Sequence, residues 1–474
     1  MGDPKGFMTV PRKDAGYRPV KERVYDYGEV EQTLDEKDRR LQASRCMDCG
    51  IPFCHWGCPV GSKIPEWQDA LYRGKKDEAY YILHSTNSFP EITGRICPAP
   101  CEKSCVLAIH EESVTIRENE CATVEQAFEA GIIKANPPRI RTGKKIAVIG
   151  SGPAGLSAAD LLNRAGNLVA VFEKNDAIGG LLRYGIPDFK LNKGVIDRRL
   201  ALFVDEGIIF KTNIAVGVDI QKEELLKKYD AVILAVGAEQ PRDLPVEGRE
   251  LDGVYFAMDF LTQQNKLNAG QMIQEEDRIS AKNKNVLVIG GGDTGSDCVG
   301  TSIRQKAKSV TQIEILPKPP EKRIDHNPWP YWPNTLRTSS SHQEGCERRW
   351  NLSTKRFIGE NGKLKQAEIV QVEWTQGEGD RWNMSEAPGT TEVVDVELAL
   401  LSMGFTNPVQ KGLLDSLGVE YDPRGNVKVN DKKQTSVTKI FAAGDAEKGA
   451  SLVVHAIEAG KVAAKNVDDF LKGV

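Results

Sequence analysis

One short pattern occurs twice in this chain of 474 residues. An apolar run leads into Gly-x-Gly-x-x-Gly and then into a stretch with helical periodicity. The first copy is KKIAVIG followed by SGPAGLSAADLLNRAG, and the second, 140 residues later, is KNVLVIG followed by GGDTGSDCVGTSIRQ. A further apolar run, NLVAVFEK or SVTQIEIL, follows each copy. Strand, glycine turn, helix and strand in this order predict a dinucleotide-binding βαβ unit. We therefore expect an α/β protein with two Rossmann-like domains.

The glycines of such a turn allow a tight bend, a close approach of the backbone to a pyrophosphate, and packing of the helix on the sheet. The phosphates then lie at the helix N-terminus, where free N–H groups and the helix dipole attract anions. Glu173 and Glu314 end the next apolar runs, 23 and 24 residues after Gly150 and Gly290, where a carboxylate can accept a hydrogen bond from a ribose hydroxyl. The residues predicted to bind the dinucleotide of the second copy are Gly290, Gly292, Asp293, Thr294, Gly295 and Glu314.

The distal sequence AAGDA favours FAD as the ligand of the first copy. Asp445 of this sequence could accept a hydrogen bond from the ribitol, and a helix starting at Ser451 would direct its positive end at the flavin. The residues predicted to bind FAD are Gly150, Gly152, Pro153, Ala154, Gly155, Glu173, Lys174, Gly180, Leu181, Ala235, Gly237, Gly444, Asp445, Ser451 and Leu452. We predict an FAD domain in two parts, 141–255 and 401–474, around an NAD(P)H domain at 256–400.

Eight of the ten cysteines lie between Cys46 and Cys121. RCMDCGIPFCHWGCP has the spacing C-x2-C-x4-C-x3-C-P, and GRICPAPCEKSC follows with C-P-x2-C-x3-C. Disulfide frameworks are rare in the reducing cytosol, and zinc sites usually take two C-x2-C pairs. The first run is closer to the ferredoxin pattern C-x2-C-x2-C-x3-C-P. Iron–sulfur ligation is therefore favoured over a zinc site.

These motifs, together with FEKNDAIGGLLRYGIPDFK and IFAAGDAEKGASLVVHAIEAGKVAA, resemble the small subunits of glutamate synthase along nearly the whole chain. Related modules occur in dihydropyrimidine dehydrogenase and in NADH-dependent ferredoxin:NADP oxidoreductases. The resemblance implies a mostly helical domain, residues 1–140, with two [4Fe–4S] clusters. The implied ligands are Cys46, Cys49, Cys54 and Cys105 for one cluster, and Cys58, Cys97, Cys101 and Glu120 for the other. Cys121 is a softer alternative to Glu120.

The resemblance also implies an activity. Electrons from NADH or NADPH would pass through FAD and the clusters to a large (alpha) subunit that makes L-glutamate from glutamine and 2-oxoglutarate. Hydride transfer needs no acid or base from a side chain, so no catalytic residue is predicted. Two alternatives remain open: the flavin subunit of a ferredoxin:NADP oxidoreductase, and a zinc-stapled nucleotide-binding scaffold without turnover.

The choice of nicotinamide depends on the residues after the second βαβ unit. Glu314 suits the free 2′-hydroxyl of NADH, whereas Lys318, Lys322 and Arg323 could bind a 2′-phosphate; we expect NADH. The segment 316–350 is rich in Pro and Trp and predicts a long ordered loop, or a contact with substrate or partner.

A net charge of −4 argues against nucleic-acid binding. The chain has no apolar run of about 18 to 20 residues, the length that a membrane span needs, and its N-terminus lacks a signal sequence. We therefore expect a cytoplasmic protein that does not bind membranes.

Overall fold

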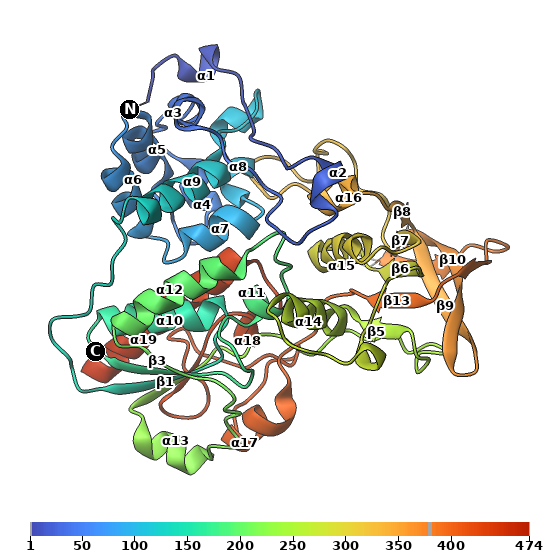
Figure 1. Ribbon diagram of the computed structural model, residues 1–474. Coiled ribbons are helices and arrows are strands. Elements are labelled where there is room, and N and C mark those ends of the chain that lie inside the picture. The colour runs from blue at the N-terminus through green and yellow to red at the C-terminus, as the bar shows by residue number, and fades with distance from the viewer. Residues whose placement is uncertain (1, 378–381, 474) are drawn as a thin grey trace.

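Helices form the part of the chain before Lys145, where the first strand begins. The computed structural model describes residues 2–377 and 382–473, and Figure 1 shows most of these helices as a layer of their own beside the two sheet-containing parts. Two of these helices, α5 (Ile64–Tyr72) and α6 (Lys76–His84), have apolar residues that recur every three or four positions. The other elements of this part are α1 (Gly6–Thr9), α2 (Val20–Arg23), α3 (Glu36–Ser44), α4 (Phe53–Gly57), α7 (Pro90–Ile96), α8 (Pro100–Lys103), the 3-10 helix η1 (Val106–Ile109) and α9 (Ile116–Glu129).

The first glycine loop belongs to a five-stranded parallel sheet with the order β14-β4-β1-β2-β3. Its central strands are apolar along their length because helices and loops cover both faces. The last strand comes from the end of the chain, so the chain leaves this domain and returns to it (Figure 1). Its elements are β1 (Lys145–Ile149), α10 (Pro153–Arg164), β2 (Leu168–Phe172), α11 (Leu181–Tyr184), α12 (Lys193–Asp205), β3 (Ile209–Lys211), α13 (Lys222–Lys228), β4 (Ala231–Leu234), the π-helix η3 (Gln410–Leu414), α17 (Asp415–Leu417), β14 (Ile440–Ala442), α18 (Asp445–Lys448) and α19 (Val453–Lys472).

The second glycine loop belongs to another parallel sheet, with the order β5-β13-β6-β7-β8. An antiparallel sheet, in which β10 pairs with β9, β11 and β12, extends from it at the right of Figure 1; the sequence pattern did not indicate this sheet. The elements are β5 (Val254–Phe256), α14 (Ala257–Asn268), the 3-10 helix η2 (Glu275–Asp277), β6 (Asn285–Ile289), α15 (Asp293–Arg304), β7 (Ser309–Glu314), α16 (Ser340–Gln343), β8 (Glu347–Trp350), β9 (Leu352–Glu360), β10 (Lys363–Gln376), β11 (Trp382–Glu386), β12 (Glu392–Asp395) and β13 (Leu398–Leu401). The fold is thus the expected one: a helical domain followed by two Rossmann-like domains.

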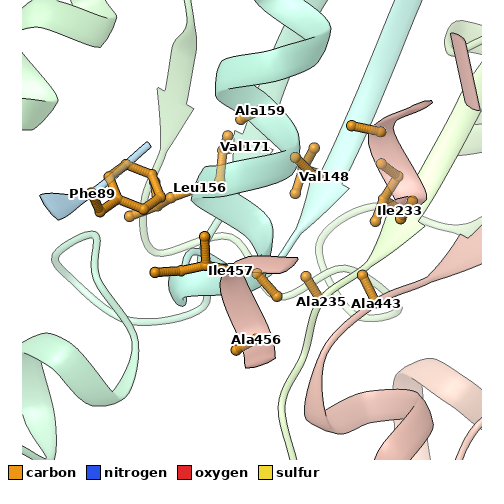
Figure 2. Packing of buried hydrophobic residues seen from close by; sticks show 14 of the residues in the cluster. Phe89, Val148, Leu156, Ala159, Val171, Ile233, Ala235, Ala443, Ala456 and Ile457 are labelled. Atoms are coloured by element: carbon orange, nitrogen blue, oxygen red, sulfur yellow. The ribbon is translucent and has the colours of Figure 1, made fainter. Parts of the chain in front are cut away.

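The core of the first dinucleotide domain continues into the helical domain. Phe89, just before α7, is fully buried beside Leu156 of α10 and Ile457 of α19 (Figure 2). A buried ion pair crosses the same boundary, because the Arg199 guanidinium donates to both carboxylate oxygens of Glu91, at 2.6 and 3.0 Å. These contacts fix the cysteine-bearing helices against the domain of the first glycine loop.

None of the helices in the described part of the chain has both the length and the apolar character required to cross a lipid bilayer.

Candidate functional site

The two glycine loops have matching geometry. Gly150 and Gly290 have φ angles of +101° and +121°, and a Cβ on either would lie within 2.4 Å of a carbonyl oxygen, that of Ala235 or Ser402. A Cβ on Gly152, by contrast, would meet nothing within 4 Å. The first glycine of the loop is therefore required by the fold, whereas the middle glycine faces open space in which a pyrophosphate could lie.

The same division holds for the remaining loop glycines. A Cβ on Gly155 or Gly295 would lie 2.1 or 2.4 Å from the carbonyl oxygen of the first glycine of its own loop, whereas one on Gly292 would be free of contacts within 4 Å. The loops lead into α10, which starts at Pro153, and α15, whose first two residues are Asp293 and Thr294. Both loops thus present backbone N–H groups at a helix N-terminus, as phosphate binding requires.

An acidic side chain supports each loop. The Glu173 carboxylate accepts the Ser151 hydroxyl at 2.5 Å, and the Ser151 N–H lies 3.3 Å from the same oxygen. The Glu314 carboxylate accepts the Gly291 N–H at 2.5 Å and the Leu316 N–H at 3.2 Å. The two glutamates therefore stand at equivalent positions, at the carboxyl end of the second strand of each βαβ unit.

Most other residues predicted to bind FAD lie around the first loop. A Cβ on Gly180 would lie 2.9 Å from the Cα of Gly152, and one on Gly444 would lie 2.7 Å from the Cβ of Ala154. Ala235 is buried beneath Gly150, and Leu181 begins α11 directly after Gly180. Lys174 and Gly237 lie farther out, where the Lys174 ammonium pairs with the Glu239 carboxylate and Gly237 approaches the same side chain.

Asp445 is close to the last helix but is already hydrogen bonded. Its carboxylate accepts the Ser451 hydroxyl at 2.6 Å, and burial raises the pKa of Asp445 above its usual value. The helix was expected to begin at Ser451, but α19 begins at Val453 with Leu452 as its N-cap. Ser451 instead belongs to the turn that Asp445 holds.

Four cysteines from two distant parts of the sequence converge in the helical domain. Cys46, Cys49, Cys54 and Cys105 line one hollow, together with apolar side chains that include Phe53 and Ile64. We call these four residues the first cysteine group. Burial raises the pKa of Cys46 to about 12 and that of Cys54 further, so these thiols need a cation or cluster to be stable as thiolates.

The second cysteine group consists of Cys58, Cys97 and Cys101, whose thiols interact electrostatically with one another and with the Glu120 carboxylate. Desolvation raises the pKa of the half-buried Glu120 to about 7, and its Oε1 accepts hydrogen bonds from Asn87 Nδ2 at 2.8 Å and Thr93 Oγ1 at 3.0 Å. These two donors hold the carboxylate on the side of the helix that faces the cysteines.

Cys121 faces another environment. Its electrostatic neighbours are Arg95, Glu125, Glu29 and Glu31, and none of the thiols of the second group is among the main ones. The Cα of Cys121 would lie 2.7 Å from a Cβ on Gly94, so this side of α9 packs tightly against α7. Successive helix residues point about 100° apart, which explains why Glu120 faces the second cysteine group and Cys121 does not.

The donor set of both groups fits an iron–sulfur cluster, because soft, buried thiolates are its preferred ligands. Within the described residues, no three His, Cys, Asp or Glu side chains are spaced to hold a single metal ion. Cys97 lies in the core that the helical domain shares with the first dinucleotide domain, and Cys58 packs against its edge. The core of the helical domain itself contains Cys54 and Cys105 of the first group and Cys101 of the second.

The segment 316–350 is not a loop throughout, because its last part forms α16 and β8. The part 317–338, which we call the strap, has no helix or regular strand. It runs from the second dinucleotide domain to the helical domain, where Trp329 packs on Phe53 with ring centroids 4.6 Å apart. The Arg323 guanidinium donates to the carbonyl oxygens of Tyr331, at 2.7 Å, and Lys103, at 3.1 Å. The Arg323 guanidinium is therefore bound to these carbonyl oxygens and is not placed beside Glu314. The Lys318 ammonium lies over the ring of Trp350.

Comparison with known proteins agrees with this architecture. Residues 144–460 match the pyridine nucleotide-disulphide oxidoreductase family, and residues 23–132 match the family described as dihydropyrimidine dehydrogenase domain II, 4Fe-4S cluster. The glutamate synthase [NADPH] small chain of Mycobacterium tuberculosis is 47% identical over 100% of this chain and 97% of its own length. The Bacillus subtilis small chain is 43% identical over 100% and 99%.

The chain belongs to the glutamate synthase small-chain family. The expectation drawn from its motifs is thereby confirmed. Glutamate synthase [NADH] of Schizosaccharomyces pombe is 44% identical over 98% of this chain, but the match spans only 22% of that longer protein. Among solved structures, Mycobacterium tuberculosis FprA in complex with NADPH aligns with a TM-score of 0.55 over 70% of this chain and 86% of its own, at 19% identity, and shows the same fold. The small-chain family thus combines an iron–sulfur domain with a flavoprotein fold.

Proposed function

We propose that this chain takes electrons from NADH or NADPH and delivers them, through FAD and two [4Fe–4S] clusters, to a large chain that makes L-glutamate from glutamine and 2-oxoglutarate. FAD would accept a hydride and the clusters would carry single electrons. The observation that carries this proposal is the contact between the second cysteine group and the core of the first dinucleotide domain. Electron transfer between the two cofactor sites needs such a contact.

The residues divide into three sets by what they would hold. The first glycine loop with Glu173 would bind the pyrophosphate and ribose of FAD, and Asp445 would meet the ribitol. The second loop with Glu314 would bind the nicotinamide dinucleotide. The two cysteine groups would each hold one cluster, with Glu120 as the eighth ligand, because it faces the second group and Cys121 does not.

We propose NADH as the preferred donor, because Glu314 stands at the ribose position and would repel a 2′-phosphate. The hydrogen bonds from Arg323 to four backbone carbonyls support this choice, since its guanidinium is then not free for a phosphate. The names of the relatives do not decide it: NADPH and NADH are both named among relatives of similar identity.

The large chain is proposed as a separate partner. In the yeast relatives the matching region makes up 22% of one longer polypeptide. We propose that the large chain corresponds to the rest of that polypeptide. We propose that the protein is cytoplasmic, because the reducing cytoplasm keeps free thiols such as those of Cys54 and Cys105 available as ligands.

The experiment is purification without air, with and without the large chain. The isolated chain is expected to be yellow-brown, to contain about eight iron atoms in two clusters, and to oxidise NADH with an artificial acceptor. It should form no glutamate until the large chain is added. Absence of iron and sulfide from the anaerobic protein, or glutamate formation by the isolated chain, would contradict the proposal.

A further inference from the structure

The strap contacts the first cysteine group although it starts in the second dinucleotide domain. Trp329 stacks at a tilt of 48° on Phe53, which lines the hollow of that group. The indole N–H of Trp329 also donates to the carbonyl oxygen of Cys105, at 3.3 Å. A single half-buried side chain thus contacts both the wall of the hollow and the backbone of one of its four cysteines.

Two further contacts fix the strap beside Trp329. Tyr331 lies edge-on to Trp56, with ring centroids 5.8 Å apart. Arg323 joins the Tyr331 carbonyl to the Lys103 carbonyl, two residues before Cys105. The strap is therefore held on the helical domain by two aromatic pairs and by hydrogen bonds to the backbone at Lys103 and Cys105.

The base of the strap is equally fixed. The Leu316 N–H donates to the Glu314 carboxylate at 3.2 Å, and the Leu316 carbonyl accepts the Asn351 N–H at 3.1 Å. Such anchoring on both domains is not needed for a loop that only connects β7 to α16. This anchoring indicates that the strap has a function at the surface of the helical domain that it covers.

We propose that Trp329 is a positioning residue that closes the first cysteine group against water and holds the backbone of Cys105. This inference rests on the proposed clusters. An aromatic ring packed on Phe53 shields this wall of the hollow from solvent, and a donor on the carbonyl of a ligand residue limits its movement. Solvent exposure and nearby hydrogen bonds both govern the stability and potential of such sites. The second dinucleotide domain would then control access to the first cluster.

The sequence allows a direct test, because trypsin separates Cys105 of the first group from Cys97 and Cys101 of the second. Cleavage after Arg95, Lys103 and Arg117 gives one peptide with Cys97 and Cys101 and another with Cys105 alone. The anaerobic holoprotein is exposed to a ferrous-iron chelator and iodoacetamide, and alkylation of each peptide is followed by mass spectrometry. The variants are Trp329→Phe, which keeps a ring but loses the N–H, and Trp329→Ala; Trp382→Ala, on an exposed tryptophan of β11, is the matched control.

We expect alkylation of Cys105 to be about fivefold faster in Trp329→Phe, the factor that one net hydrogen bond supplies, and faster still in Trp329→Ala. Cys97 and Cys101 should react at the wild-type rate in every variant, and Trp382→Ala should match the wild type throughout. An unchanged Cys105 rate in Trp329→Ala, or an equal rise for both peptides, would overturn the role of Trp329 while leaving the proposed function intact. A wild-type protein without iron would overturn both.

Discussion

The buried ion pair between Arg199 and Glu91 joins the first dinucleotide domain to α7, the helix whose C-cap is Cys97. Both side chains are almost inaccessible, with 5% and 0% exposure. Removing one partner of a buried pair leaves an uncompensated charge and costs about 3–5 kcal/mol. We therefore predict that Glu91→Ala strongly destabilises this boundary.

The expected shift follows from the size of the chain. Unfolding entropy is about 2.1 cal/mol/K per residue, which gives about 1 kcal/mol/K for 474 residues. The cost of Glu91→Ala then lowers the Tm by about 3–5 °C, and by more if the domains unfold separately. Differential scanning calorimetry of the anaerobic protein measures this shift.

The matched control is Glu78→Ala, which breaks the ion pair between Glu78 and Lys75. The side chains of these two residues are 51% and 52% exposed. Exposed pairs contribute about 0–1 kcal/mol, so this variant should stay within about 1 °C of the wild type. Replacing both buried partners, Glu91→Leu with Arg199→Met, should recover most of the loss, because no charge is then left unpaired. If Glu91→Ala melts like the control variant, the reasoning about this boundary is refuted.

Three further predictions concern the cofactor sites. Glu120→Ala should lower iron from about eight to about four atoms per chain, whereas Cys121→Ala should leave it unchanged; the opposite result would make Cys121 the ligand. Gly152→Ala should fold but lose flavin absorbance, because its Cβ enters only open space in the protein. The same change at Gly292 should keep the flavin and raise the KM for NADH, and loss of flavin from this second variant would contradict the division between the loops. Glu314→Ala should lower kcat/KM for NADH about tenfold, the effect of losing one hydrogen bond to a charged group, and that for NADPH less; equal losses would remove Glu314 from the choice of nucleotide.

The sequence by itself was sufficient for the parts of the protein that depend on local spacing. Glycines at the first and third positions of each loop are dictated by carbonyl oxygens within about 2.4 Å of where a Cβ would stand, and this requirement leaves a repeated signature. The helices α5 and α6 could likewise be predicted, because their apolar residues recur at helical spacing and face one core. Features that depend on residues close together in the chain can therefore be read from the sequence pattern.

Only the tertiary structure decided which side chains meet across the chain. Glu120 and Cys121 are neighbours in sequence, and the packing of α9 on α7 alone turns the first toward the second cysteine group. The strap shows no periodicity in its sequence, so its contact with Cys105 could not be predicted. The sequence pattern likewise did not indicate the antiparallel sheet around β10. Such pairings join residues many positions apart through packing, and packing has no fixed spacing that a sequence pattern could record.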